Sequence, residues 1–200
     1  MQGASLAGAS CDAMAARERW NAVAGLMEGD RQRVRNLLAR FRAAGASLES
    51  EVRGWSMTGC LASGDRIRIH CAAPAIWRRG AVVAAVARGG LVAHRVAWVG
   101  RTRRSRGWLI ARGDATMLCD APVAVDDIVG QVTGVDTGSG WQAVPPPPRR
   151  RSPVRAALVL AVCVVALELH PGLAGRIARA LWRWKARREG VSIPLDQGGS

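Results

Sequence analysis

The sequence has very little lysine. Lys185 is the single lysine, although lysine and arginine together number 29 and the net charge is +14. A positive charge of this size is typical of proteins that bind nucleic acid or an anionic membrane surface. In this chain nearly all of the positive charge comes from arginine, and the sequence is also rich in alanine and glycine. Compositional bias alone can produce such a pattern. We therefore expect the main function to lie elsewhere, and we do not expect nucleic acid as a partner.

The sequence also lacks any C-x-x-C pair, and its five cysteines are odd in number. These two features argue against a disulfide framework and against the common zinc sites. We expect no metal and no cofactor. The simplest interpretation is that the cysteines are free, buried and act as small apolar side chains. They are Cys11, Cys60, Cys71, Cys119 and Cys163.

The first twelve residues lack the charged start and the apolar run of a secretory signal peptide. They likewise show no apolar membrane anchor. We therefore expect neither feature at the start of the chain.

With 49% hydrophobic residues, the 200-residue chain can build one domain of ordinary size with appendages. Changes in composition and in hydrophobic periodicity divide it into five segments. These are an N-terminal helical segment (1–46), a β domain (47–144), a proline- and arginine-rich linker (145–153), an apolar and basic amphipathic tail (154–189) and a flexible C-terminus (190–200).

Residues 11–45 are predicted to be helical, with Asp30 as an N-cap and Gly45 as a C-cap. Apolar residues recur there at helical spacing, and the opposite face is rich in arginine. The apolar residues are Val34, Leu37, Leu38 and Phe41. Such a helix can read DNA, dock a partner or pack on its own domain. We favour packing, because no helix-turn-helix partner precedes it.

From Ser47 onward the hydrophobic period changes to two, and short apolar runs alternate with glycine or charge. The fold class is therefore predicted to be mainly β. The expected strands lie at Leu48 to Val52, Ile67 to Ile69, Ala81 to Val86, Leu91 to Val99, Trp108 to Ala111 and Ile128 to Val135. Arg101 to Arg106 is expected to be an exposed hairpin connection, although such a loop can also contact phosphate.

The tail begins with an uninterrupted apolar run from Ala156 to Leu167, which Glu168, His170 and Pro171 then interrupt. As a helix this run is about 18 Å long, short of the ~30 Å hydrocarbon core of a membrane. The run therefore does not establish a transmembrane helix.

Residues 173–185 follow as a basic amphipathic helix with tryptophan at its edge, which suits a membrane interface. The alternative is a pair of helices packed on the protein itself. We expect membrane association, because the two helices are consecutive and the linker separates them from the β domain. The side of the membrane is open, and a cytoplasmic location is the alternative.

Four short motifs follow one another through the β domain. They are Gly54-Trp55-Ser56-Met57, Gly64-Asp65, His94-Arg95-Val96, and Gly113-Asp114 with the nearby Asp120. A serine, a histidine and an aspartate thus occur at expected strand ends, in the order of a nucleophile, its base and an orienting carboxylate.

These motifs resemble the successive boxes of the signal peptidase I superfamily, and most closely those of its Ser-His type, found in archaea and in the endoplasmic reticulum. The resemblance covers roughly Leu48 to Val135, and four ordered boxes are far more specific than one serine motif. The family usually has proline two residues after the methionine, whereas this chain has Gly59, followed by Cys60. We therefore expect a less rigid loop after the serine.

The resemblance implies a role for each matching residue. Ser56 is the expected nucleophile, and its backbone N–H is an expected oxyanion donor. Histidine or lysine is the base in this superfamily. Because Lys185 lies beyond the linker, His94 is the expected base, ahead of His70 and His170.

Asp120 is expected to hold the imidazole of His94 in the correct tautomer. Asp114 is expected to support the triad or tie down its loop. Asp65 and Gly64 are expected to form the turn that fixes the serine loop, with Met57 in support. Asp126 and Asp127 are expected on the surface.

The expected function is that of a serine endopeptidase resembling signal peptidase. It would cleave a precursor protein or peptide after small residues, with the substrate bound as an added strand. One alternative is a self-cleaving regulator of the SOS-repressor type, with Val23-Ala24-Gly25 as a possible cleavage site. Another is a non-catalytic basic module that binds anionic lipid or nucleic acid.

Overall fold

The computed structural model describes residues 31–71, 77–87, 90–148 and 153–189. Several expectations lie outside these residues. They are the helix over 11–30 with its Asp30 cap, Cys11, the Val23-Ala24-Gly25 site, the second half of the linker and the C-terminal segment 190–200.

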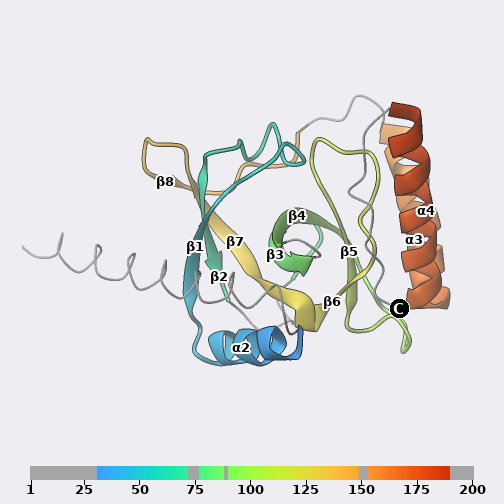
Figure 1. Ribbon diagram of the computed structural model, residues 1–200, viewed down its shortest axis with the longest axis horizontal. Coiled ribbons are helices and arrows are strands. Elements are labelled where there is room, and N and C mark those ends of the chain that lie inside the picture. The colour runs from blue at the N-terminus through green and yellow to red at the C-terminus, as the bar shows by residue number, and fades with distance from the viewer. Residues whose placement is uncertain (1–30, 72–76, 88–89, 149–152, 190–200) are drawn as a thin grey trace, which may run out of the picture.

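The described core of the protein is one curled antiparallel sheet that forms a half-barrel (Figure 1). Its strands are β1 (Ser47–Glu51), β2 (Arg66–His70), β3 (Val82–Ala87), β4 (Gly90–Val99), β5 (Trp108–Arg112), β6 (Val123–Ala124), β7 (Ile128–Asp136) and β8 (Trp141–Gln142). The order across the sheet is β1-β2-β7-β3-β4-β5-β6, with β8 paired to β7. The fold is therefore mainly β, as the alternating sequence predicts.

Alternation explains how the strands build their core. On β2, Ile67 and Ile69 are buried while Arg66 points to solvent and Arg68 is only partly covered. These isoleucines share a core cluster with Leu48 of β1 and Val132 of β7. The two strands that the sequence analysis missed, β6 and β8, have two residues each and are too short to show a period.

Helix α2 (Arg31–Ala43) packs on this domain, as favoured above. Val34 and Leu38 lie in the core cluster that lines the sheet. Gly45, two residues after the end of the helix, has a φ of 57°, and the Ala46 N–H donates to the Phe41 carbonyl at 3.0 Å. This is the glycine C-cap that the sequence indicates.

Ion pairing also holds α2 in place. Arg35 donates to both carboxylate oxygens of Asp127, at 2.6 and 3.0 Å. Asp127 ends the short 3-10 helix η2 (Val125–Asp127), and Arg42 donates to the carbonyls of Val125 and Asp126. Asp126 is exposed, as expected, and Asp127 is partly exposed, with the added role that its carboxylate joins η2 to α2.

The tail forms two helices, α3 (Pro153–Leu169) and α4 (Pro171–Glu189), which lie side by side as a helical hairpin (Figure 1). One face of this hairpin packs on β5. The shared buried cluster contains Ile110, Cys119, Cys163, Ala166, Leu167 and Ala174. The expectation that the linker separates the tail from the β domain is therefore wrong, because small and apolar side chains of α3 and α4 fit closely against β5.

Among the residues that the structure describes, none of the helices is both long enough and apolar enough to cross a membrane.

Candidate active site

Ser56 lies in the loop that joins β1 to β2, and hydrogen bonds close this loop at its base. The Val52 N–H donates to the Asp65 carbonyl at 2.8 Å, and the Gly64 N–H donates to the Val52 carbonyl at 3.0 Å. The Asp65 carboxylate accepts from the Ala62 N–H at 2.7 Å. Gly64 has a φ of 97°, a conformation that L side chains rarely adopt. Asp65 and Gly64 thus form the turn that closes the serine loop.

Within the loop, Met57 anchors the chain beside the serine. Its side chain is buried in the same core cluster as Leu61. Its sulfur also accepts from the Asp114 N–H at 3.4 Å. Met57, the residue after Ser56, is therefore held by core packing and by this hydrogen bond, whereas Trp55, the residue before Ser56, is 62% exposed.

His94 on β4 bridges the serine and Asp120. Its Nε2 lies 2.8 Å from Ser56 Oγ, within hydrogen-bonding distance. Its Nδ1 is hydrogen-bonded to Asp120 Oδ2. The imidazole is almost fully buried, whereas the Asp120 side chain remains 24% exposed. Three residues from separate parts of the chain are thus joined in one line of polar contacts.

Two different contacts place Asp120 opposite the imidazole. Its own N–H donates to the Ala111 carbonyl at 2.9 Å, which holds it to the end of β5. Directly before it, the Cys119 carbonyl accepts from Trp182 Nε1 of α4 at 3.1 Å. The helical hairpin therefore supports the segment that holds Asp120.

Gly113 brings the chain after β5 against the serine. A Cβ atom at this position would lie 2.4 Å from the Ser56 carbonyl oxygen, a distance that real Cβ atoms essentially never show. The Ala115 N–H donates to the same carbonyl at 2.9 Å. Thr116 is buried, and its hydroxyl oxygen lies 3.0 Å from the Gly113 carbonyl oxygen and 3.2 Å from that of Leu118, so it can donate to either. This tight turn locks the serine to the segment that leads to Asp120.

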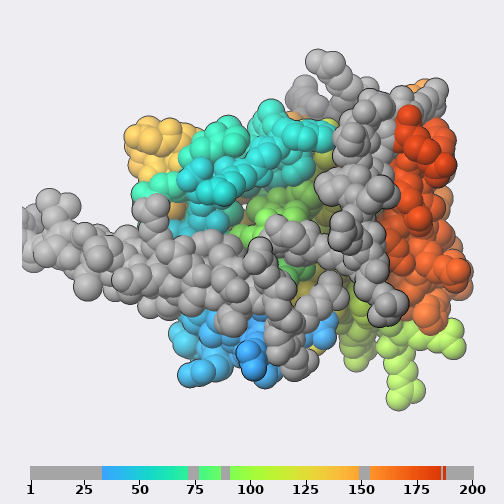
Figure 2. Space-filling model, in the orientation of Figure 1, coloured from blue at the N-terminus to red at the C-terminus, as the bar shows by residue number. Residues whose placement is uncertain are grey.

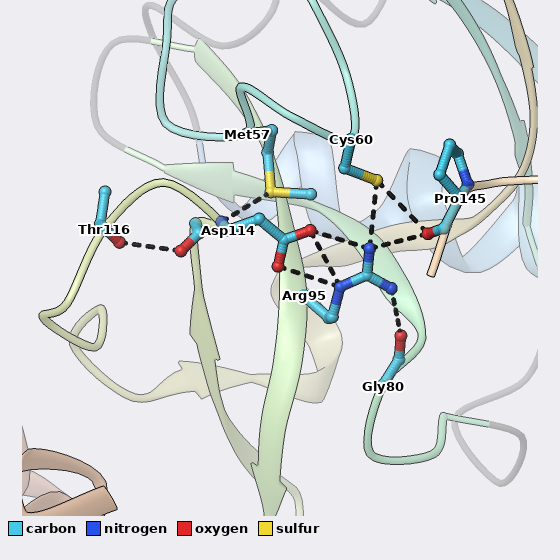
Figure 3. Close-up of polar contacts among 8 residues, drawn as sticks. Met57, Cys60, Gly80, Arg95, Asp114, Thr116 and Pro145 are labelled. Carbon is cyan, nitrogen blue, oxygen red and sulfur yellow. Dashed lines mark hydrogen bonds and ion pairs between the residues drawn. The ribbon is translucent and has the colours of Figure 1, made fainter. Parts of the chain in front are cut away.

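Arg95 follows His94 on β4 and pairs with the second aspartate, Asp114 (Figure 3). Its Nη2 donates to Asp114 Oδ2 at 2.8 Å, and its Nε donates to both carboxylate oxygens at 3.0 Å. Both side chains are almost fully buried. Because successive residues of a strand point to opposite faces, His94 and Arg95 serve separate sites.

The Arg95 guanidinium also joins three further segments. It donates to the Gly80 carbonyl at 2.7 Å, to the Pro145 carbonyl at 3.0 Å and to the Cys60 sulfur at 3.1 Å (Figure 3). Pro145 begins the linker, so the linker is fixed to the β domain at its first residue. Burial would lower the pKa of Arg95, but the Asp114 carboxylate outweighs it and raises that pKa.

Cys60 lies beside this pair without forming a reactive thiolate. Burial raises the pKa of its thiol, and the nearby Asp114 adds to that increase, while Arg95 acts in the opposite direction. Since the thiolate is the nucleophilic form, this cysteine is held in its unreactive state. Cys71, Cys119 and Cys163 are likewise buried and form no disulfide with one another.

The structure brings together Ser56, His94 and Asp120. Of the expected supporting residues, Asp114 pairs with Arg95, Asp65 and Gly64 close the base of the serine loop, and Met57 anchors that loop in the core. The other two histidines of the chain make different contacts. His70 ends β2, where it pairs with Ser47 and Gln131, and His170 Nδ1 accepts from the Gly172 N–H at 3.1 Å between α3 and α4. Sequence reasoning placed Arg95 in a motif and Pro145 in the linker, but it gave neither of them, nor Thr116, a contact at this site. For Arg95, its place beside His94 on a strand was the available signal.

Chemically, this arrangement suits proton transfer from a serine to a histidine whose far nitrogen is held by a carboxylate. Among the described residues, no group of histidine, cysteine or acidic side chains is placed to hold a metal ion.

Comparisons with models of protein families, with curated proteins and with solved structures find no match to this chain.

Proposed function

We propose that this protein is a serine endopeptidase that works by a Ser-His-Asp mechanism. The observation that best supports the proposal is the continuous contact from Ser56 Oγ through His94 to Asp120. A serine hydroxyl is a poor nucleophile at neutral pH and needs a base within about 2.6–3.2 Å. The imidazole lies within that distance.

In the proposed reaction, Ser56 Oγ attacks the carbonyl carbon of the scissile peptide bond while its proton passes to His94 Nε2. Asp120 accepts a hydrogen bond from His94 Nδ1, and this tautomer leaves Nε2 free to act as the base. The Asp120 carboxylate then stabilises the imidazolium that forms. His94 returns the proton to the leaving amine. Water then releases the acyl group by the same route.

The substrate that we propose is a precursor protein or peptide, bound in an extended conformation and cleaved after a small residue. This specificity follows from the resemblance to signal peptidase of the Ser-His type. The serine loop adds a feature of its own, since Trp55 precedes Ser56 directly and is exposed. An apolar residue of the substrate near the cut would cover it.

The first test is covalent labelling of the full chain with a fluorophosphonate probe, together with cleavage of fluorogenic peptides that have alanine before the cut. Ser56→Ala and His94→Ala should each abolish labelling and cleavage. The expected loss is up to about 10⁶-fold in kcat, as for other serine peptidase triads. Because the residues act as a unit, the double variant should be no worse than either single one.

Ser139→Ala is the matched control, because Ser139 is an exposed serine in the β7–β8 turn. It should label and cleave like the wild type. Turnover that persists in a folded His94→Ala protein would remove histidine as the base. An N-terminal fragment that appears when the purified chain is incubated alone would instead favour the self-cleaving regulator.

A further inference from the structure

The outward face of α3 is an exposed apolar stripe. The exposed side chains recur every three to four residues, so they lie along one side of the helix. Together with the first leucine of α4 they are 42% to 78% exposed. They are Val154, Leu158, Val162, Val165, Leu169 and Leu173.

The opposite face of α3 is already packed. Cys163, Ala166 and Leu167 are buried against Ile110 of β5. A helix that is apolar on all sides is normally buried on all sides. Contiguous exposed apolar surface on a protein marks a site of interaction. One face of α3 thus packs on the β domain, and the stripe on its other face is suited to bind something outside the chain.

The charge around the stripe has one sign. Between Pro153 and Arg188 the chain has one acidic residue, Glu168. Its carboxylate is engaged at the base of the β4–β5 turn, where it accepts from Trp98 Nε1, the Arg101 and Thr102 N–H groups and the Ser105 hydroxyl. The end of α3 therefore presents no unengaged carboxylate to a partner.

The same contacts place basic side chains beside the stripe. The turn that Glu168 holds presents four exposed arginines next to the end of α3, and it projects beside the hairpin in Figure 2. Helix α4 adds further exposed arginines to the same hairpin. These residues are Arg101, Arg103, Arg104 and Arg106 of the turn, and Arg176, Arg179 and Arg183 of α4.

We propose that this face of the hairpin lies on an anionic membrane surface. The apolar stripe would enter the boundary of the acyl chains, and the arginines would bind lipid phosphates. A second copy of the chain fits this face less well, since it would bring the arginines of two copies together. The contact also differs from the one that the sequence suggests, because Ile177 and Leu181 of α4 pack inward.

The test is flotation of the full chain with vesicles of two compositions. One is pure phosphatidylcholine, and the other has one third of it replaced by phosphatidylglycerol. The wild type should float with the mixed vesicles, and high salt should release part of it, because screening weakens attraction between exposed charges. Leu158→Asp should lower its partitioning at least about tenfold, since a charge would have to enter the apolar boundary.

Ser139→Asp is the matched control, since it adds the same charge to an exposed residue of the distant β7–β8 turn and should float like the wild type. Arg103→Glu combined with Arg104→Glu should abolish the preference for the anionic vesicles. The proposal is overturned if Leu158→Asp floats unchanged, if both vesicle types bind equally, or if Leu158→Asp converts a dimer to a monomer. Ser56→Ala should float like the wild type, so this result is independent of peptidase activity.

Discussion

His94 and Arg95 are neighbours on β4, and their side chains point to opposite faces of the strand. On one face His94 pairs with Asp120, and on the other Arg95 pairs with Asp114. The His94–Asp120 pair reaches solvent through Asp120, and its far end contacts the Ser56 hydroxyl. The Arg95–Asp114 pair is almost fully buried and joins three other segments, at Cys60, Gly80 and Pro145. The partly open pair is suited to move a proton, and the sealed pair is suited to hold the loops in place.

The largest expected difference between the two pairs is in turnover. Asp120→Asn should lower kcat by roughly 10⁴-fold, because an amide at this position favours the wrong imidazole tautomer. Its thermal unfolding should stay close to that of the wild type. The measurement is kcat on the fluorogenic peptide together with a melting curve. If Asp120→Asn lost stability instead of turnover, the assignment of the two aspartates would be reversed.

Asp114→Asn should show the opposite result. Removing one partner of a buried ion pair leaves the Arg95 charge uncompensated and typically costs about 3–5 kcal/mol. We therefore expect a much lower midpoint in urea unfolding. The fraction that remains folded should still be labelled by the fluorophosphonate probe. Full stability of the variant would contradict a structural role for this pair.

A smaller effect is expected from Trp182→Phe, which keeps an aromatic ring but removes the hydrogen bond to the Cys119 carbonyl. The Asp120 segment should become less well placed, and kcat should fall by roughly tenfold, as for the loss of one positioning hydrogen bond. KM should change little. The far-downfield proton resonance of the His94–Asp120 hydrogen bond should broaden.

Trp184→Phe is the control for this effect, since Trp184 is half exposed on the same helix. It should leave both kcat and the proton resonance unchanged. Equal effects of the two substitutions would show that the hydrogen bond to Cys119 has no special part in placing Asp120.

The smallest effect is expected at the far end of the hairpin. Partial burial would raise the pKa of Glu168, but hydrogen bonds from Ser105, Arg101, Trp98 and Thr102 outweigh it and lower that pKa from 4.5 to about 2. The ionised carboxylate therefore stabilises the fold fully above pH 4.5, and this contribution is lost as the pH falls through about 2.

Glu168→Gln should consequently lower the melting temperature by a few degrees at pH 7. The difference from the wild type should shrink steadily below pH 4.5. Melting curves recorded between pH 7 and pH 2 measure it. A difference that grew on acidification would contradict the assigned direction of the pKa shift.

The sequence allowed prediction of those features whose signal is local. Alternation along Arg66 to Ile69 predicts a strand, and Gly45 predicts the end of a helix, because both depend on neighbouring residues. The order of Ser56, His94 and Asp120 directed attention to the residues that the structure joins. The Arg95 contacts could not be predicted in this way, because they join segments from Cys60 to Pro145 that are distant along the chain.

From the sequence, packing of the two helices on the protein is only the alternative, for a different reason. Residues 156–167 are apolar throughout, so their sequence does not indicate which side faces the protein. In the structure, the small side chains of Ala166 and Ala174 lie in the buried cluster with Ile110 of β5, and they mark the face that packs.

Gly113 sets a steric limit on how this arrangement can vary. Gly113 is not among the glycines with a positive φ, so its backbone conformation is open to other residues. Only the lack of space for a Cβ atom restricts this position to glycine. A single methyl group there would push the Ser56 backbone away from the strand that precedes Asp120 while leaving the side chains of Ser56, His94 and Asp120 chemically intact. Gly113→Ala thus offers a way to separate the assembly of a triad from its chemistry.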